Sequence, residues 1–114
     1  AAGVEVEDVA SKVKVDGQIV SGAVTLATAA SLAIKLTDKF TQAAFDGALT
    51  AGEITVRTDS ETATVSTATY ANGVLTLALT GTAFIKGGIT NFYVKISADD
   101  CYMKETKFTV DDTP

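Results

Sequence analysis

The sequence predicts an all-β sandwich with antiparallel pairing, on three observations. Apolar residues alternate with polar or small residues along several short segments. Turn signals recur about every 8 to 12 residues, the spacing typical of sandwiches. No helical pattern is long enough for the crossover that parallel strands need. The chain has 114 residues, the size of one domain, so we expect a single domain over residues 1–114 with about seven to nine strands.

The clearest strand signal lies between Ala63 and Thr80. Three leucines alternate with other residues over 75–79, the period of a strand that buries one face. Asn72-Gly73 precedes them, and this dipeptide favours a type I′ turn because both central residues need a positive φ. We therefore expect a two-stranded hairpin whose leucine row is covered by a second apolar sheet face.

Other segments show a similar pattern of apolar and β-branched residues. Asp16-Gly17 predicts a second hairpin turn, and residues 98–105 read as a loop. Phe92, Val94 and Ile96 are expected to share one buried face. The further strands that the sequence predicts lie at 4–9, 13–15, 19–26, 31–40, 53–58, 90–97 and 106–110.

Residues 41–53 are rich in alanine and differ from the strand-like segments around them. Thr41 is a candidate helix cap, and Gly47 would end a helical turn. We expect at most one short helical turn near 41–46, because a full amphipathic helix needs about three turns. Together with Phe40 and Leu49, this segment is expected to close one end of the sandwich.

Composition excludes several classes of function. The net charge is −5 and the nine Lys and Arg residues are scattered, which weighs against nucleic acid and anionic membranes as partners. The chain has no histidine, the commonest general base and a common metal ligand. No apolar run approaches the roughly 20 residues of a membrane span. The single cysteine, Cys101, reads as a small buried hydrophobe or an idle thiol.

The N-terminal segment lacks a basic start and a long apolar centre, so it does not read as a signal peptide. Neither end shows start or stop features, and the chain closes on the acidic residues Asp111 and Asp112. We therefore expect the domain to be excised from a longer multidomain chain.

Three stretches together resemble a bacterial immunoglobulin-like domain of the type repeated in S-layer and other cell-surface proteins. They are residues 31–56, residues 64–97 with the Asn-Gly hairpin and the late aromatic strand, and residues 104–110 with the closing Phe-Thr strand. The likeness covers about Gln18 to Val110 and departs from the family at 98–105, where an Asp-Gly-Asn-like turn is usual. The resemblance implies a non-enzymatic building block of a secreted or surface-anchored chain, and it carries over no catalytic residue.

Acidic pairs are the first candidate site. Asp99-Asp100 and Asp111-Asp112 offer oxygen ligands of the kind that calcium prefers. No spacing matches the twelve-residue calcium loop, so solvated carboxylates are the simpler interpretation. If calcium binds, we expect Asp111 and Asp112 to hold it where they meet a neighbouring domain. No other cofactor is expected.

Exposed aromatic residues are the second candidate site. Tyr93 lies on the strand face opposite Phe92 and Val94, and Tyr102 lies in the expected loop. Aromatic rings on a flat sheet stack on sugar rings in many sandwich modules, so these two residues are candidates for contact with a cell-wall polysaccharide. An interdomain contact or a minor aromatic cluster is the alternative interpretation, because sugar platforms usually align several rings.

Catalytic motifs are missing from the sequence. A serine nucleophile would lack histidine, and neither GxSxG nor SxxK occurs. No aromatic subsites accompany a carboxylate pair, as glycoside hydrolysis would need. The paired glycines lie in turns and not before a helix, which argues against a phosphate cradle. We therefore expect a protein that is not an enzyme.

The leading interpretation is a structural module in a tandem array on a bacterial surface, acting as spacer and lattice contact. Its partners would be neighbouring domains of the same chain or like subunits, without nucleic acid and without membrane insertion. Two alternatives stay open: a carbohydrate-binding module of a secreted protein, and a phage tail or capsid decoration domain.

Overall fold

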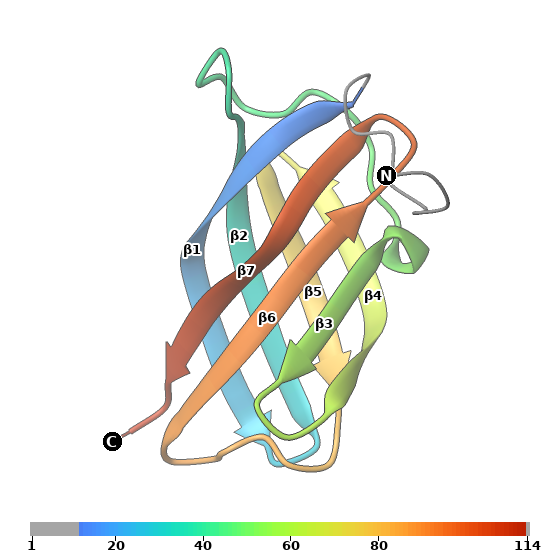
Figure 1. Cartoon of the computed structure of the whole chain (residues 1–114). Helices are drawn as coiled ribbons and strands as arrows, with labels where there is room; N and C mark the ends of the chain where they lie inside the picture. The colour runs from blue at the N-terminus through green and yellow to red at the C-terminus, as the bar shows by residue number, and fades with distance from the viewer. Residues whose placement is uncertain (1–11, 114) are drawn as a thin grey trace, which may run out of the picture.

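Seven strands make up the fold in a computed structural model that describes residues 12–113 (Figure 1). One 3₁₀ turn, η1 (Ala51–Glu53), precedes the third strand. The strand expected at 4–9 lies outside the described residues. The strands are β1 (Val13–Leu26), β2 (Ala29–Asp38), β3 (Ile54–Thr58), β4 (Thr62–Ala71), β5 (Val74–Thr80), β6 (Ile89–Ser97) and β7 (Cys101–Asp111).

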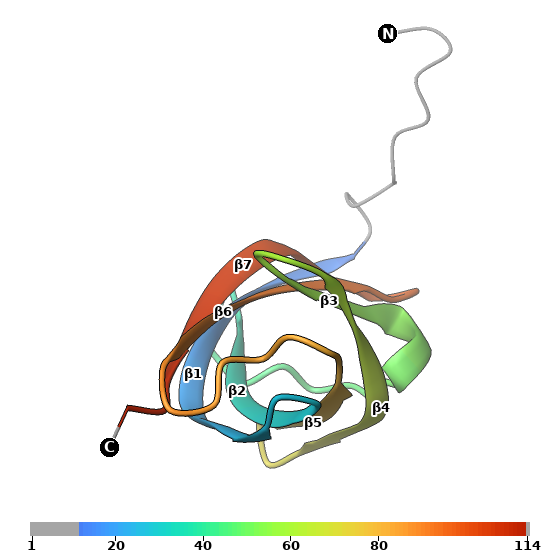
Figure 2. The ribbon, with the colours of Figure 1, turned by 90° about the horizontal axis from the view of Figure 1, so that it is seen from below.

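The strands close into a barrel in the order β1-β2-β5-β4-β3-β6-β7. Figure 2 views them end-on around a common interior. Every neighbouring pair is antiparallel except β1 and β7, which run parallel. The all-β class and the expected number of strands are confirmed, whereas the expected pair of separate sheets is corrected to a closed barrel.

Two short ladders close the barrel. Only two residue pairs join β1 to β7 in the described chain, Val13 with Cys101 and Lys14 with Tyr102. Two pairs likewise join β3 to β4. The remaining ladders are longer and form two sheets, β1-β2-β5-β4 and β3-β6-β7. In the 14-residue β1, the first two residues pair with β7 and the residues from Val15 onward pair with β2, with irregular register after Ile19 and after Val24.

The hairpin predicted between Ala63 and Thr80 is confirmed. Asn72 and Gly73 have φ values of 55° and 78°, the positive values that a type I′ turn requires. The ladder continues from Ala71 opposite Val74 along both arms. The three leucines of β5 are buried.

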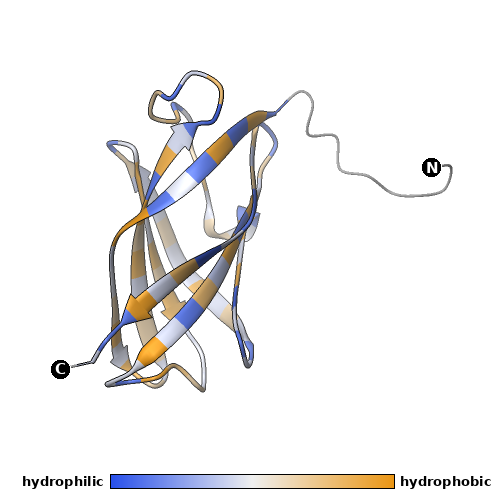
Figure 3. Cartoon of the chain, turned by 60° about the vertical axis from the view of Figure 1, so that its left-hand side comes forward, coloured by the Kyte–Doolittle hydropathy of each residue, from blue (hydrophilic) through white to orange (hydrophobic). Residues whose placement is uncertain are grey.

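The barrel interior is one hydrophobic cluster built from the inward faces of the strands. Strict alternation of buried and less buried residues in β2, β5 and β6 produces it, and Figure 3 shows the corresponding bands of hydropathy. Phe92, Val94 and Ile96 share the buried face, as predicted. The largest fully buried side chains are Phe92, Leu32, Ile34, Leu36, Leu75, Leu77, Leu79, Ile96 and Met103.

The second hairpin turn predicted at Asp16-Gly17 is wrong, because both residues lie within strand β1. A Cβ at Gly17 would lie 2.9 Å from Met103 Sδ and 2.9 Å from Phe108 Cζ. Gly17 therefore allows β1 to lie close to the side chains of β7. A glycine within a strand can have this role without forming a turn.

The expectation of at most one short helical turn is confirmed for the described residues, but its expected place near 41–46 is wrong. Asp38 Oδ1 accepts hydrogen bonds from the backbone N–H of Phe40 (2.7 Å) and Thr41 (3.2 Å), and Gln42 N–H donates to the Asp38 carbonyl at 2.8 Å, which folds residues 38–42 as an isolated turn. The helical turn lies later, at η1, where Glu53 Oε1 accepts the Thr50 N–H at 2.8 Å.

The segment before η1 closes one end of the barrel, although not with the expected residues. Phe45 and Leu49 are buried, as expected of a plug. Phe40 is instead 96% exposed, so its assignment to the plug is wrong. The turn around Asp38 places the Phe40 ring in solvent.

The loop expected at 98–105 is restricted to residues 98–100, because β7 begins at Cys101. Ala98 N–H donates to the Cys101 carbonyl at 2.9 Å and forms this tight turn. Cys101 and Met103 are buried while Tyr102 is only partly buried, the alternation of a strand. Tyr102 therefore lies on a strand and not in a loop.

Leu77→Ala is expected to lower the free energy of unfolding by about 2 to 5 kcal/mol, because Leu77 is fully buried at the centre of the leucine row. Chemical denaturation measures this loss, with the exposed neighbour Thr76→Ala as the control. A loss below about 1 kcal/mol would contradict the packing described above.

Gly73→Ala is expected to cost about 1 to 2 kcal/mol, because an L-residue at φ +78° is strained. Gly52→Ala is the matched control: a Cβ added there would have no atom within 4 Å, and the φ of Gly52 is not positive. Thermal and chemical unfolding of both variants give the comparison. Equal stability of the two would argue against the type I′ turn.

Candidate functional site

The two acidic pairs lie at opposite ends of the barrel. Asp99 and Asp100 form the turn between β6 and β7, whereas Asp111 and Asp112 lie where β7 ends. The length of β7 separates them, so the structure does not bring the two pairs together. Among residues 12–113, no three carboxylate or thiol groups gather as metal ligands.

The carboxylates at the end of β7 accept hydrogen bonds from within the chain. Asp112 Oδ2 accepts the Gly87 N–H at 2.7 Å and lies 3.4 Å from Lys86 Nζ. Both contacts lower the pKa of Asp112, the backbone contact most strongly. Asp111 accepts from the hydroxyl and N–H of Thr113, which lowers the pKa of Asp111. Calcium at this pair stays a prediction that requires further ligands from a neighbouring domain.

Tyr93 lies on the outer face of β6 at the centre of a polar network, named here the Tyr93 network. The Arg57 guanidinium lies 4.1 Å from the ring centroid, a cation–π distance. The Tyr93 hydroxyl donates to Asp59 Oδ1 at 2.7 Å. The other members of the network are Asn91, Glu105 and Thr109.

Hydrogen bonds connect the rest of the Tyr93 network. Asn91 Nδ2 donates to Asp59 Oδ2 at 2.9 Å, and Thr109 Oγ1 donates to Asn91 Oδ1 at 2.8 Å. Arg57 binds both Glu105 oxygens, at 2.7 and 3.0 Å. These contacts lower the pKa of Asp59, through Asn91 first and Tyr93 second, and the pKa of Glu105, through Arg57.

The Tyr93 network limits what Tyr93 offers a ligand. Arg57 covers one face of the ring, and the hydroxyl is already engaged with Asp59. A sugar ring therefore has at most the other face for stacking. The network connects β3, β6 and β7 across the outside of their sheet, which is a role in holding strands together.

Tyr102 lines a pocket of about 200 Å³ beside the β1–β7 ladder. Its side chain is partly buried, and the pocket lies where β1 and β7 separate after their two paired residues. The other lining residues are Lys14, Val15, Asp16, Lys39, Lys104 and Thr106.

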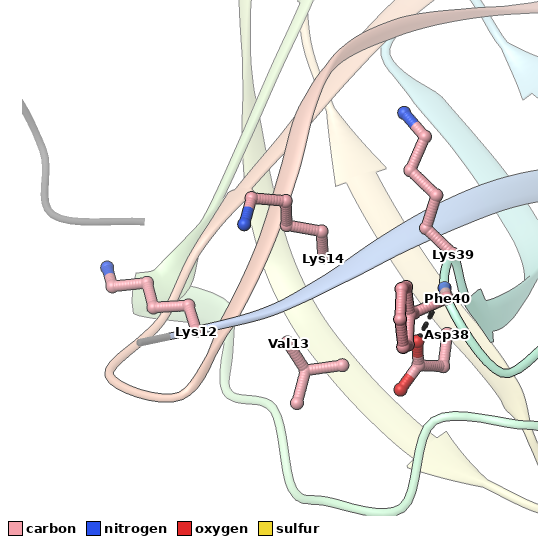
Figure 4. A pocket seen from close by; sticks show the side chains of 6 residues that line it. All are labelled: Lys12, Val13, Lys14, Asp38, Lys39 and Phe40. Carbon is pink, nitrogen blue, oxygen red and sulfur yellow. Dashed lines mark hydrogen bonds between the residues drawn. The ribbon is translucent and has the colours of Figure 1, made fainter. Parts of the chain in front are cut away.

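A second pocket of about 360 Å³ adjoins the first and shares Lys14 and Lys39 with it. Figure 4 shows the side chains around it, among them three lysines and the ring of Phe40. The two pockets together are named the lysine cleft. The lining of the second pocket is Lys12, Val13, Lys14, Asp38, Lys39 and Phe40.

The residues that line the lysine cleft carry a net positive charge, whereas the net charge of the whole chain is negative. The cleft gathers four of the nine basic residues, Lys12, Lys14, Lys39 and Lys104, with two aspartates, a local net charge of +2 against −5 for the chain. Sequence reasoning missed this cluster because its lysines are scattered along the chain. The parallel β1–β7 ladder and the turn after β2 bring them together.

A third pocket, of about 420 Å³, lies between the hairpin turn and the segment before η1. It is larger, but its lining is mostly small or apolar. Its tyrosine, Tyr70, donates its hydroxyl to the Phe45 carbonyl at 2.7 Å. The lysine cleft therefore holds the stronger chemical signal for a ligand.

Cys101 is fully buried at the start of β7. Burial raises the pKa of its thiol to about 11, with a smaller contribution from Asp100. The thiolate is therefore scarce at neutral pH, which argues against a role as a nucleophile. Among the described residues, no helix is both long and apolar enough to cross a membrane.

No protein-family model, curated protein or solved structure matches the chain.

Asp59→Asn is expected to flatten the dependence of thermal stability on pH. Because the folded pKa of Asp59 lies below its ordinary value of 3.8, its ionised form stabilises the fold above that value. This stabilisation is lost as pH falls through the folded pKa. Between pH 6 and about pH 3, the melting temperature of the unaltered protein should fall further than that of the variant.

Asp99→Asn, in the exposed turn before β7, is the control for this pH experiment. It should retain the pH dependence of the unaltered protein. Identical curves for Asp59→Asn and the unaltered protein would show that the Tyr93 network does not depend on the Asp59 charge.

Proposed function

We propose that the chain is a non-catalytic, immunoglobulin-like structural module of a bacterial cell-surface protein. It acts as a spacer and as a contact between neighbouring domains or like subunits. The observation that carries this proposal is the placement of the two points where the chain enters and leaves the barrel.

The described chain enters the barrel at Val13 and leaves it after Asp111, at opposite ends (Figure 1). Val13 pairs with Cys101, the first residue of β7, whereas Asp111 is the last residue of that strand. An 11-residue strand at about 3.3 Å per residue separates the two points by roughly 33 Å. Modules joined through such ends follow one another in a row, the arrangement that a spacer requires.

The strand order supports the immunoglobulin-like part of the proposal. Constant-type immunoglobulin domains hold strands A, B, E and D in one sheet and C, F and G in the other. Lettering the seven strands here in chain order gives the same division, β1-β2-β5-β4 and β3-β6-β7. The two short ladders, β1–β7 and β3–β4, close these two sheets into a barrel.

The side-chain chemistry supports a non-catalytic role. The chain has no histidine, and the thiol of Cys101 is buried with a raised pKa. The aspartates of the lysine cleft have local partners: Asp16 Oδ1 lies 3.8 Å from Lys39 Nζ, and Asp38 accepts backbone N–H groups. No base and nucleophile are therefore paired there.

Tension between the two ends would load the β1–β7 ladder along its strands. Because the chain enters on β1 and leaves on β7, pulling slides these parallel strands past each other and strains their contacts together. The Val13 N–H donates to the Asp100 carbonyl at 2.8 Å at this seam. This geometry suits a spacer that transmits force between its neighbours.

Val13→Pro is expected to lower the force needed to unfold the chain when it is pulled from its two ends, because proline cannot donate the hydrogen bond to Asp100. Single-molecule force spectroscopy measures this. Val13→Ala keeps the N–H group and is the matched control. Equal unfolding forces for the two variants would argue against a force-transmitting seam and against the spacer role built on it.

A further inference from the structure

The lysine cleft displays an aromatic ring that the fold itself does not use. Phe40 is 96% exposed, although a phenylalanine favours burial. A defined turn holds the backbone of this segment: Asp38 Oδ1 accepts two backbone N–H groups, and Asp38 N–H donates to the Ala43 carbonyl at 2.7 Å. The exposed ring lines the larger pocket, where it is available for contact with a ligand.

Each pocket of the lysine cleft has one aromatic ring in its lining. Phe40 lines the larger pocket (Figure 4) and Tyr102 lines the smaller, and Lys14 and Lys39 line both. The lysines give the cleft its positive charge, and each ammonium group is a hydrogen-bond donor. This pattern matches a polymer that repeats a flat apolar face and an anionic group.

The backbone around the larger pocket of the lysine cleft favours a polysaccharide over an acidic peptide. Peptides often dock on sheet edges through main-chain hydrogen bonds. At this pocket, the Lys14 carbonyl already accepts from Lys39 N–H, and Val13 N–H already donates to the Asp100 carbonyl, both at 2.8 Å. A ligand in the larger pocket therefore meets the ring and the charged side chains that line it.

We propose that the lysine cleft binds an acidic polysaccharide, whose sugar rings stack on Phe40 and Tyr102 and whose carboxylate or phosphate groups contact Lys14 and Lys39. Ammonium–anion hydrogen bonds are the stronger kind, and the aromatic faces add apolar contact. This site goes beyond the spacer role, because it attaches the module to an anionic polymer. The spacer role does not require it.

Affinity electrophoresis of the full chain tests the proposal with alginate, phosphorylated dextran and neutral dextran in the gel. Alginate carries carboxylates and phosphorylated dextran carries phosphates, so these two arms distinguish the source of the anion. Retardation is expected with at least one acidic polymer and not with neutral dextran. It should weaken as salt rises from about 0.05 to 0.5 M, because partly exposed charges are screened.

Two variants locate the site. Lys14→Gln with Lys39→Gln is expected to weaken binding about tenfold, since two exposed ionic contacts are lost. Phe40→Ala, which leaves the charge unchanged, is expected to weaken it about fivefold. The matched control is Lys95→Gln with Lys107→Gln, which removes the same charge from exposed positions on β6 and β7. This control should bind within about twofold of the unaltered protein.

Circular dichroism checks that each variant folds, and Phe40→Ala should fold normally because its side chain is exposed. Three results would overturn the proposal. One is the absence of retardation by either acidic polymer, and another is an equal loss of binding in the two lysine pairs. The third is binding to poly-L-glutamate as tight as to the acidic polymers and insensitive to Phe40→Ala, which would assign the cleft to an acidic protein.

Discussion

Burial of two facing apolar rows is the constraint on which the rest of the structure depends. The leucine row of β5 and the Phe92, Val94 and Ile96 row of β6 belong to one core. Each of these strands is flanked on both sides, β5 by β2 and β4, and β6 by β3 and β7. Neither row is shielded from water by its own sheet, so the two sheets must face each other. The first strand then spans both sheets.

Closure by β1 links the core to the proposed role. The strand leaves β7 after two residue pairs and continues along β2, and Gly17 lets it pass close over Met103 and Phe108. The same divergence opens the smaller pocket of the lysine cleft beside Tyr102. The path of β1 therefore creates a positively charged surface on the described barrel, beside the strand β7 whose length separates the points where the chain enters and leaves.

Local patterns in the sequence were enough to predict the strands of the core and the Asn72-Gly73 turn, because alternation and positive φ are local properties. They failed where distant residues decide the outcome. Asp16-Gly17 has the composition of a turn, yet contact with β7 makes it part of a strand. Of the candidate ligand residues, Tyr102 lies in the lysine cleft, whereas the lysines around it are separated in sequence by up to 92 positions, from Lys12 to Lys104, and showed no pattern.

The parallel contact between β1 and β7 is tested most directly by nuclear Overhauser effects in solution. The account predicts cross-strand contacts that place Val13 beside Cys101 and Lys14 beside Tyr102, in parallel register. These should appear together with the antiparallel contacts of β1 with β2, such as Ile19 with Ile34. An antiparallel register between β1 and β7, or contacts of β1 with β2 alone, would contradict the closed barrel and the opposite placement of its two ends.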